Sequence, residues 1–223
     1  MDWSPILISM RTAGLSIVFT FFMGILAAGM VVRISLSRMK TILDGIFTFP
    51  LVLPPTVAGF FLLYVFGVKR PVGQFFLEYF SVKIAFSWGA TVLAAVVMSF
   101  PLMYRSARGA FEQVDDTLVQ AARTLGMGEW TIFRRVLLAN AVPGVVSGGV
   151  LAFARGLGEF GATAMIAGNI AGKTRTLPMA VYSEVAAGNM EAAYSYVAII
   201  VVIAFLSVFL MNGTMWYSQK KSR

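Results

Sequence analysis

The stretch AGLSIVFTFFMGILAAGMVV, from Ala13 to Val32, contains twenty residues and no charged side chain. A helix needs about 20 predominantly apolar residues to cross the hydrocarbon core of a bilayer. The stretch is therefore long and apolar enough to span a membrane. Arg33, Arg38 and Lys40 follow it rather than precede it. This is not the order of a cleavable signal peptide, in which the positive charge comes first.

Four further apolar segments of similar size follow, at 45–68, 84–104, 142–170 and 194–217. The sequence thus predicts an all-α polytopic membrane protein with five transmembrane helices, or six if residues 1–11 add one. The 1–11 segment is too short to span alone and is expected to form an interfacial helix. Because no linker or repeat divides the chain, residues 1–223 are expected to form a single transmembrane domain.

The composition agrees with a location in a bilayer. Hydrophobic residues make up 58% of the chain and charged residues 13%, whereas a soluble domain has about 25% charged residues. The chain has no His and no Cys. Zinc sites that use these ligands, cysteine nucleophiles and Ser-His-Asp triads are therefore excluded. We expect no catalytic residue and no metal site.

The positive charges predict an orientation. With the N-terminus outside, five spans place eleven Lys and Arg residues in cytoplasmic segments and six in outer segments. Lys and Arg concentrate in the cytoplasmic loops of membrane proteins. The sequence therefore predicts an outer N-terminus and a cytoplasmic C-terminus. We attribute the net charge of +8 to membrane topology and not to nucleic-acid binding.

The cytoplasmic segment 105–140 is longer than a connection between two spans requires. Asp115 and Asp116 are suitable N-caps for a helix that starts directly after them. Gly126 is expected to end this helix in a left-handed conformation, and Glu129 to begin a second one. An apolar stripe at helical spacing is formed by Leu118, Ala121, Ala122 and Leu125. Periodicity alone also allows a helix pair that rests on its own bundle or on lipid headgroups.

A family resemblance is carried by Gln120-Ala121-Ala122, Gly126 and the later Val136-x-Leu138. This pattern resembles the EAA motif of permease subunits in binding-protein-dependent ABC importers. The chain has Gln120 where that family usually has Glu. It also has Ala where the family usually has Pro, directly after Leu138.

Other stretches are similar to molybdate-type permeases over nearly the whole chain. They are FPLVLPP at 49–55, VAG at 57–59, MSFPL at 98–102, LAFARGLGEFGAT at 151–163 and GNIAGKTRTLP at 168–178. Sulfate and thiosulfate permeases are close relatives of these proteins. The resemblance implies the type I ABC importer permease fold.

The resemblance also implies a function and partners. The segment 117–138 would contain a coupling helix that binds a groove of a cytoplasmic ATPase and transmits its closure. The expected contact residues are Gln120, Ala121, Ala122, Leu125, Gly126, Glu129, Phe133 and Arg134. The expected assembly has a second copy of this chain, two ATPase subunits that carry ATP and Mg, and an extracytoplasmic substrate-binding protein. It would import molybdate or tungstate, or next sulfate, across the cytoplasmic (inner) membrane of a bacterium or archaeon. This chain would hold no cofactor and would not be an enzyme.

The fourth predicted span contains charged residues. Gly144, Gly148 and Ala152 form a seam of small residues at which helices pack closely, and Arg155 and Glu159 are expected to continue that face. A charge within a span costs several kcal/mol, so it normally faces a partner or a water-filled cavity. Two interpretations remain open: a structural ion pair, or a place on the translocation pathway or its gate.

Prolines interrupt the second predicted span. Pro50, Pro54 and Pro55 each lack a backbone donor, so a broken or kinked helix is expected there. Irregular backbone at membrane depth is tolerated only inside protein or beside a cavity. A static kink and a role in gating are both consistent with this pattern.

Two other classes of protein were weighed. A passive anion channel or secondary carrier, without an ATPase, accommodates Arg155 and Glu159 equally well, but it has no need of a coupling helix. A membrane-embedded enzyme would have to use Asp115 and Asp116, which are better explained as helix caps.

Overall fold

The computed structural model describes residues 2–221, which form helices and no strand. The elements are α1 (Ser4–Arg33), α2 (Ser37–Val52), α3 (Pro55–Phe66), α4 (Pro71–Phe80), α5 (Trp88–Glu112), α6 (Asp116–Thr124), α7 (Glu129–Ile132), the π-helical turn η1 (Phe133–Leu137), α8 (Leu138–Leu157), α9 (Gly161–Ile166), α10 (Leu177–Ala186) and α11 (Met190–Lys221).

Four continuous helical segments are long and apolar enough to cross a membrane, and the bent pair α2–α3 makes a fifth candidate. The predicted all-α fold with about five spans is thereby confirmed. Within the described residues there is no separate interfacial helix before the first span. Residues 4–11 are instead the first turns of α1, where Pro5 is well placed because its missing N–H would be unpaired anyway.

The second predicted span is two helices and not one. α2 and α3 meet at an angle of 109°. A proline disfavours the helical conformation of the residue before it, and Leu53 is accordingly extended. Pro54 is the N-cap of α3 and Pro55 its first residue, where a ring-fixed φ suits the first turn.

The fourth span also differs from its predicted bounds. It runs without interruption from Glu129 to Leu157, through α7, η1 and α8, and ends well before residue 170. At the other side of the connection, α5 continues to Glu112. The segment that joins these two helices is therefore 113–128, shorter than the predicted 105–140.

The core lies where α5 packs between α1 and α8. Two hydroxyl pairs join α1 to α5: the Oγ1 atoms of Thr12 and Thr91 are 2.9 Å apart, and Oγ1 of Thr20 is 3.1 Å from Oγ of Ser99. The predicted seam of small residues packs α8 on α5, because a Cβ atom at Gly148 would come within 2.5 Å of Cβ of Ser106. These contacts make α1, α5 and α8 one closely packed unit.

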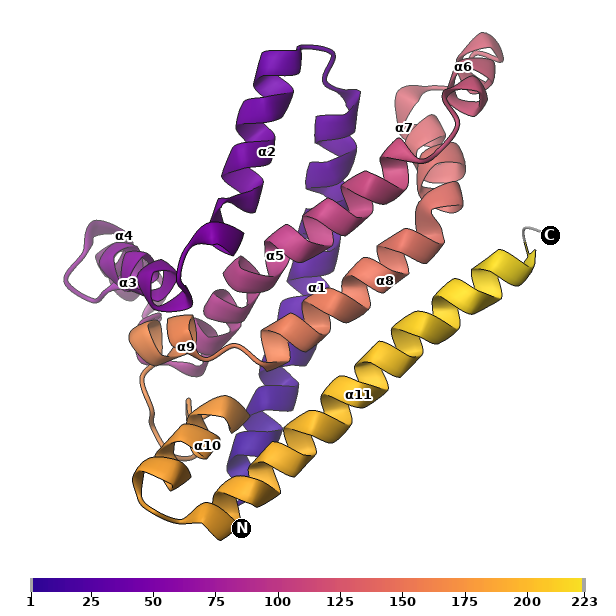
Figure 1. The fold of residues 1–223 in the computed structure, drawn as a ribbon. Coiled ribbons are helices and arrows are strands. Elements are labelled where there is room, and N and C mark those ends of the chain that lie inside the picture. The colour runs from indigo at the N-terminus through magenta and orange to yellow at the C-terminus, as the bar shows by residue number, and fades with distance from the viewer. Residues whose placement is uncertain (1, 222–223) are drawn as a thin grey trace.

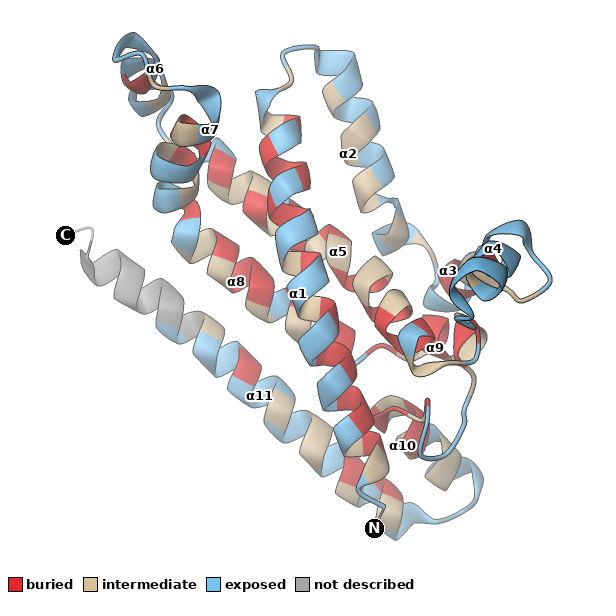
Figure 2. Cartoon of the chain, turned by 180° about the vertical axis from the view of Figure 1, so that it is seen from behind, coloured by how far each residue is buried: buried red, intermediate tan, exposed pale blue. Residues whose placement is uncertain are grey.

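Different elements lie at the two ends of the bundle. Figure 1 places the end of α1, the start of α2 and α6 together at one end, and α10 with the N-terminus at the opposite end. Figure 2 shows buried positions concentrated on α1, α5 and α8. α2 has no buried residue at all. It is therefore an outlying helix, attached to the core mainly through α5.

Candidate functional site

The 113–128 connection contains the capped helix that the sequence predicts. Oδ1 of Asp115 accepts a hydrogen bond of 2.9 Å from the backbone N–H of Thr117, and α6 begins at Asp116. This bond holds the pKa of the Asp115 carboxyl below its usual range, because it favours the ionised form. The cap fixes the point at which the chain turns from the membrane helix α5 into α6.

The end of α6 is closed by a glycine and an ion pair. Gly126 has a φ of +74°, a left-handed conformation that glycine adopts without strain. Nε of Arg123 then lies 2.8 Å from Oε1 of Glu129, across the turn. Both features tie α6 to the start of α7, so the helix-turn-helix has a defined shape.

Arg33, at the end of α1, anchors this unit to the bundle. Its Nη2 donates a 2.8 Å hydrogen bond to the carbonyl oxygen of Glu129, and its guanidinium lies 5.0 Å from the centre of the Phe133 ring. Phe133 is buried and makes an edge-on contact with Phe111. The expected contact of Phe133 with a partner needs correction: its side chain packs inside the bundle and positions the loop.

Most of the other expected contact residues lie at the surface. Those exposed are Gln120, Ala121, Leu125, Gly126, Glu129 and Arg134, whereas Ala122 is buried. Leu125 is 81% exposed and Trp130 is 58% exposed. The sequence analysis did not select Trp130, although a tryptophan next to the Glu129 helix start was the available signal. Three large apolar side chains of this segment, Leu118, Leu125 and Trp130, are exposed, and we call them together the loop surface.

The charges of the fourth span meet at the break after α8. Nη1 of Arg155 lies 2.7 Å from Oε2 of Glu159, as an ion pair without the alignment of a hydrogen bond. Oε1 of Glu159 accepts a 2.8 Å hydrogen bond from the backbone N–H of Ala162. Glu159 lies beyond the end of α8 at Leu157, and not on its face as expected. Its buried carboxylate joins α8 to the start of α9.

The two breaks of the chain lie against each other. A Cβ atom at Gly161 would come within 2.8 Å of Cβ of Pro55, and one at Gly59 within 2.6 Å of Cα of Ala162. The start of α3 therefore packs on α9, directly after the Glu159 carboxylate. Of the three prolines, Pro55 takes part in this contact, while Pro50 lies half-buried in the last turn of α2.

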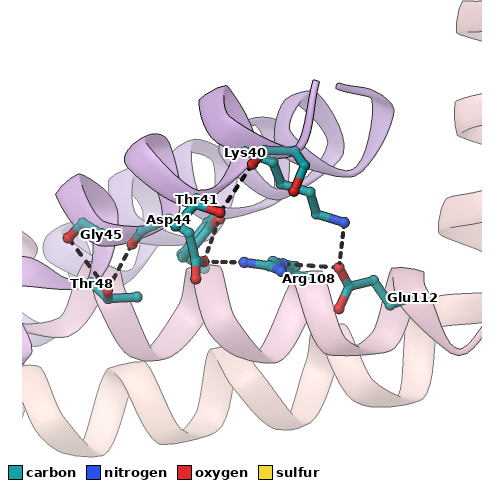
Figure 3. Close-up of polar contacts among 9 residues, drawn as sticks. Lys40, Thr41, Asp44, Gly45, Thr48, Arg108 and Glu112 are labelled. Atoms are coloured by element: carbon teal, nitrogen blue, oxygen red, sulfur yellow. Dashed lines mark hydrogen bonds and ion pairs between the residues drawn. The ribbon is translucent and has the colours of Figure 1, made fainter. Parts of the chain in front are cut away.

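A charged cluster that the sequence did not predict joins α2 to α5. Asp44 pairs with Nη1 of Arg108, and Oε1 of Glu112 receives Nε of Arg108 at 3.0 Å and Nζ of Lys40 at 2.9 Å (Figure 3). The hydroxyl of Tyr104 donates a 3.0 Å hydrogen bond to Oδ1 of Asp44. We call these five side chains the α2–α5 cluster.

No group of three or more metal-ligating side chains occurs in the part of the chain that the structure describes. Three features of the described residues have a defined geometry. They are the loop surface, the contact between the α2–α3 and α8–α9 breaks, and the α2–α5 cluster.

Comparisons with known proteins indicate the family of this chain. The family model described as "Binding-protein-dependent transport system inner membrane component" matches residues 20–221. The chain is 42% identical over 222 residues to the "Molybdenum transport system permease protein ModB" of Escherichia coli (strain K12), covering 99% of this chain and 96% of that protein. It is 40% identical over 210 residues to the "Putative molybdenum transport system permease protein YvgM" of Bacillus subtilis (strain 168), covering 94% and 92%.

Solved structures with the same fold are more distant in sequence. An inward-facing structure of the MetNI methionine ABC transporter matches with a TM-score of 0.71 at 18% identity, covering 93% of this chain and 91% of that one. A bacterial alginate ABC transporter, in complex with a periplasmic protein bound to an alginate pentasaccharide, matches with a TM-score of 0.76 at 15% identity, covering 94% and 76%. The extent of the family match and the identity to the two permeases place this chain in the family of binding-protein-dependent transport system inner membrane components.

Proposed function

We propose that this chain is the transmembrane subunit of an ATP-driven importer of molybdate, with tungstate and then sulfate as the next candidate anions. The proposal is supported by the molybdenum permeases of Escherichia coli and Bacillus subtilis, which match nearly the whole chain. Two copies of the chain would enclose the pathway. An extracytoplasmic binding protein would deliver the anion, and two separate ATPase subunits would bind ATP and Mg.

The observation that carries the proposal is the loop surface. Large apolar side chains that remain exposed on a well-defined element usually mark a protein contact. Leu118 and Leu125 are exposed in the connection between two long helices, and Trp130 is exposed in the first turn of the second one. Arg33 and the Arg123–Glu129 pair keep this element in one shape. The loop surface is thus suited to dock an ATPase and to pass on its movement.

The route of that movement follows the chain. The 113–128 connection continues directly into α5 on one side and, through α7 and η1, into α8 on the other. α8 ends at the Arg155–Glu159 pair, and α9 then packs on α3. A displacement of the loop surface would therefore shift α8. That shift would change the contact between the break at α2–α3 and the break at α8–α9. We place the gate at this contact, with Arg155, Glu159 and the prolines at positions 50, 54 and 55.

The end of the bundle that carries α6 is assigned to the cytoplasm. Arg33, Arg38, Lys40, Arg123 and Arg134 gather on the helix ends and connections at this end. Positive residues of this kind favour the cytoplasmic side. The proposed orientation has an outer N-terminus and a cytoplasmic C-terminus in the inner membrane.

The test is reconstitution of this chain with the ATPase encoded beside it. ATPase activity in proteoliposomes is measured with binding protein loaded with molybdate, tungstate or sulfate in turn. Stimulation by one loaded form supports the proposal and identifies the anion. Failure of the two subunits to associate, together with a passive anion leak, would instead support a channel.

A variant tests the loop surface itself. Leu125→Glu should abolish copurification with the ATPase, because it places a carboxylate in an apolar contact. Leu36→Glu is the matched control, since Leu36 is also an exposed leucine and lies in the short α1–α2 connection at the same end. Normal copurification of Leu125→Glu would overturn the assignment of the loop surface.

A further inference from the structure

A cavity of about 640 Å³ lies between the ends of α5 and α8, below the start of α6. Its polar lining is supplied by Arg105, Ser106, Gln113, Asp115, Asn140 and Ser147. The remaining wall consists of small and apolar residues. The cavity is open on one side and lies next to the loop surface, on the end of the bundle assigned to the cytoplasm.

Among the described residues that line the cavity, Arg105 is the only cation. Elsewhere on the long helices, Arg33 donates to the Glu129 carbonyl, Lys40 and Arg108 belong to the α2–α5 cluster, and Arg155 pairs with Glu159. Within residues 2–221, the Arg105 side chain is exposed and makes no hydrogen bond or ion pair, although its charge also acts on the Asp44 carboxylate. A guanidinium presents several donors that match the oxygens of a tetrahedral anion.

Ser147 provides a second observation at the same cavity. Its side chain is 3% exposed, and its Oγ has no hydrogen-bond partner among the described residues. A buried hydroxyl without a partner is costly, and in native structures such a group usually has a partner in the protein or in an ordered water or ion. Ser147, on α8, and Arg105, on α5, both line the cavity.

We propose that this cavity is a low-affinity binding site for the transported tetrahedral oxyanion on its way into the cytoplasm, with Arg105 and Ser147 as its ligands. The identity of the anion rests on the proposed function. Arg155, for which the sequence left a structural ion pair and a place on the pathway open, is paired with Glu159. Arg105 is the cation that lines the cavity and would meet the anion there.

The cavity also accounts for release. Asp115 lines the same space, and its carboxylate repels an anion although one oxygen is bound to the start of α6. An exit site must bind weakly enough to let its ion leave. One wall of the cavity belongs to α5 and α8, and another, with Asp115 and Leu118, belongs to the loop that carries the loop surface. Movement of that loop would thus change the space around the anion.

The absence of cysteine from the chain allows a direct test on the assembled transporter. Ser106→Cys places a single thiol in the cavity wall, and Asn140→Cys does the same on α8 should the first variant assemble poorly. The rate of labelling by a water-soluble thiol reagent is measured in detergent with and without molybdate. Ser35→Cys, in the exposed α1–α2 connection, is the control thiol.

Molybdate should slow labelling of the cavity thiol about twofold at a concentration equal to its dissociation constant, because half of the sites are then occupied. The Ser35→Cys thiol should be unaffected. Protection of the cavity thiol by molybdate should be lost in Arg105→Gln and retained in Arg105→Lys, which keeps the positive charge. It should also be retained in Arg38→Gln, the control, because Arg38 is an exposed cation that does not line the cavity.

Two results would overturn the proposal. One is an absence of protection by molybdate, or protection that survives Arg105→Gln. The other is protection in nanodiscs containing phosphatidylglycerol but not in those made of phosphatidylcholine, with no effect of molybdate in either. That result would assign the cavity to a lipid phosphate. Since labelling requires no transport, these outcomes are distinguishable from a failure of the proposed import activity.

Discussion

Two groups of charged side chains hold parts of this molecule together in different ways. Arg155 and Glu159 are four residues apart and pair at the break between α8 and α9, where the Glu159 side chain is 1% exposed. The α2–α5 cluster joins two helices whose charges are more than sixty residues apart in the chain, and all its charged side chains are partly exposed.

The difference lies in what each group can contribute. A buried ion pair offsets a large desolvation cost, so the removal of one partner leaves an uncompensated charge. Partly exposed pairs contribute little individually because water and salt screen them. α2 nevertheless has no buried residue and is held to α5 by the cluster and by edge-on contacts of Phe47 with Phe100 and Tyr104. The cluster therefore positions a helix that the core does not enclose.

The largest effect is expected for Arg155→Gln. The change leaves the Glu159 carboxylate buried without its partner, which typically costs about 3–5 kcal/mol, and the partial exposure of Arg155 places the value near the lower limit. Thermal unfolding of the purified transporter measures the loss. The double variant Arg155→Gln/Glu159→Gln should recover most of it, because the amide oxygen of the introduced glutamine can still accept from the Ala162 N–H. Equal stability of the single variant and the unmodified protein would show that the pair is not truly buried in the assembly.

A smaller effect is expected for Tyr104→Phe. It removes the hydroxyl that donates to Asp44 and leaves the ring contacts of Tyr104 in place. The loss of a hydrogen bond to a charged group costs about 1.5–3 kcal/mol, and the partial exposure of Asp44 places the value near the lower limit. Ser87→Ala is a suitable comparison, because its hydroxyl donates to a carbonyl of its own chain segment and joins no second helix. Crosslinking between cysteines placed on α2 and α5 should weaken in Tyr104→Phe alone.

The pair Asp44–Arg108 is expected to contribute less again. A double-mutant cycle with Asp44→Asn and Arg108→Gln should give a coupling energy of about 0.2–1 kcal/mol, as for other exposed pairs. Unfolding at low and high salt completes the measurement, since the coupling should fall as the ionic strength rises. A coupling that is large and independent of salt would mean that a second copy of the chain covers this cluster.

Local features of the fold were predictable from the sequence. The cap at Asp115, the left-handed Gly126 and the seam at Gly148 each depend on residues within one or two helical turns, and the structure contains all three. The double proline at positions 54 and 55 likewise predicts a break, although a one-dimensional pattern carries no information about its angle of 109°.

Features that depend on distant partners were not predictable. The α2–α5 cluster requires knowing that Asp44 faces Arg108, and that follows from how two spans pack. Phe133 resembles a loop residue in the sequence, yet the packing of Phe111 and Arg33 around it makes it part of the core. The cavity around Arg105 is likewise defined by α5, α6 and α8 together. In each case the missing information was tertiary contact.

The smallest effect is expected for Lys40→Gln, at the edge of the cluster. Glu112 keeps Nε of Arg108 at 3.0 Å when Nζ of Lys40 is removed, so the carboxylate is not left alone. The cost should stay within about 0.5 kcal/mol, as for most surface changes. Thermal unfolding beside Arg38→Gln, a cation of the same helix without a partner among the described residues, measures the difference. A loss as large as that of Arg155→Gln would mean that the cluster acts as one cooperative unit, and that α2 detaches from α5 when any member is removed.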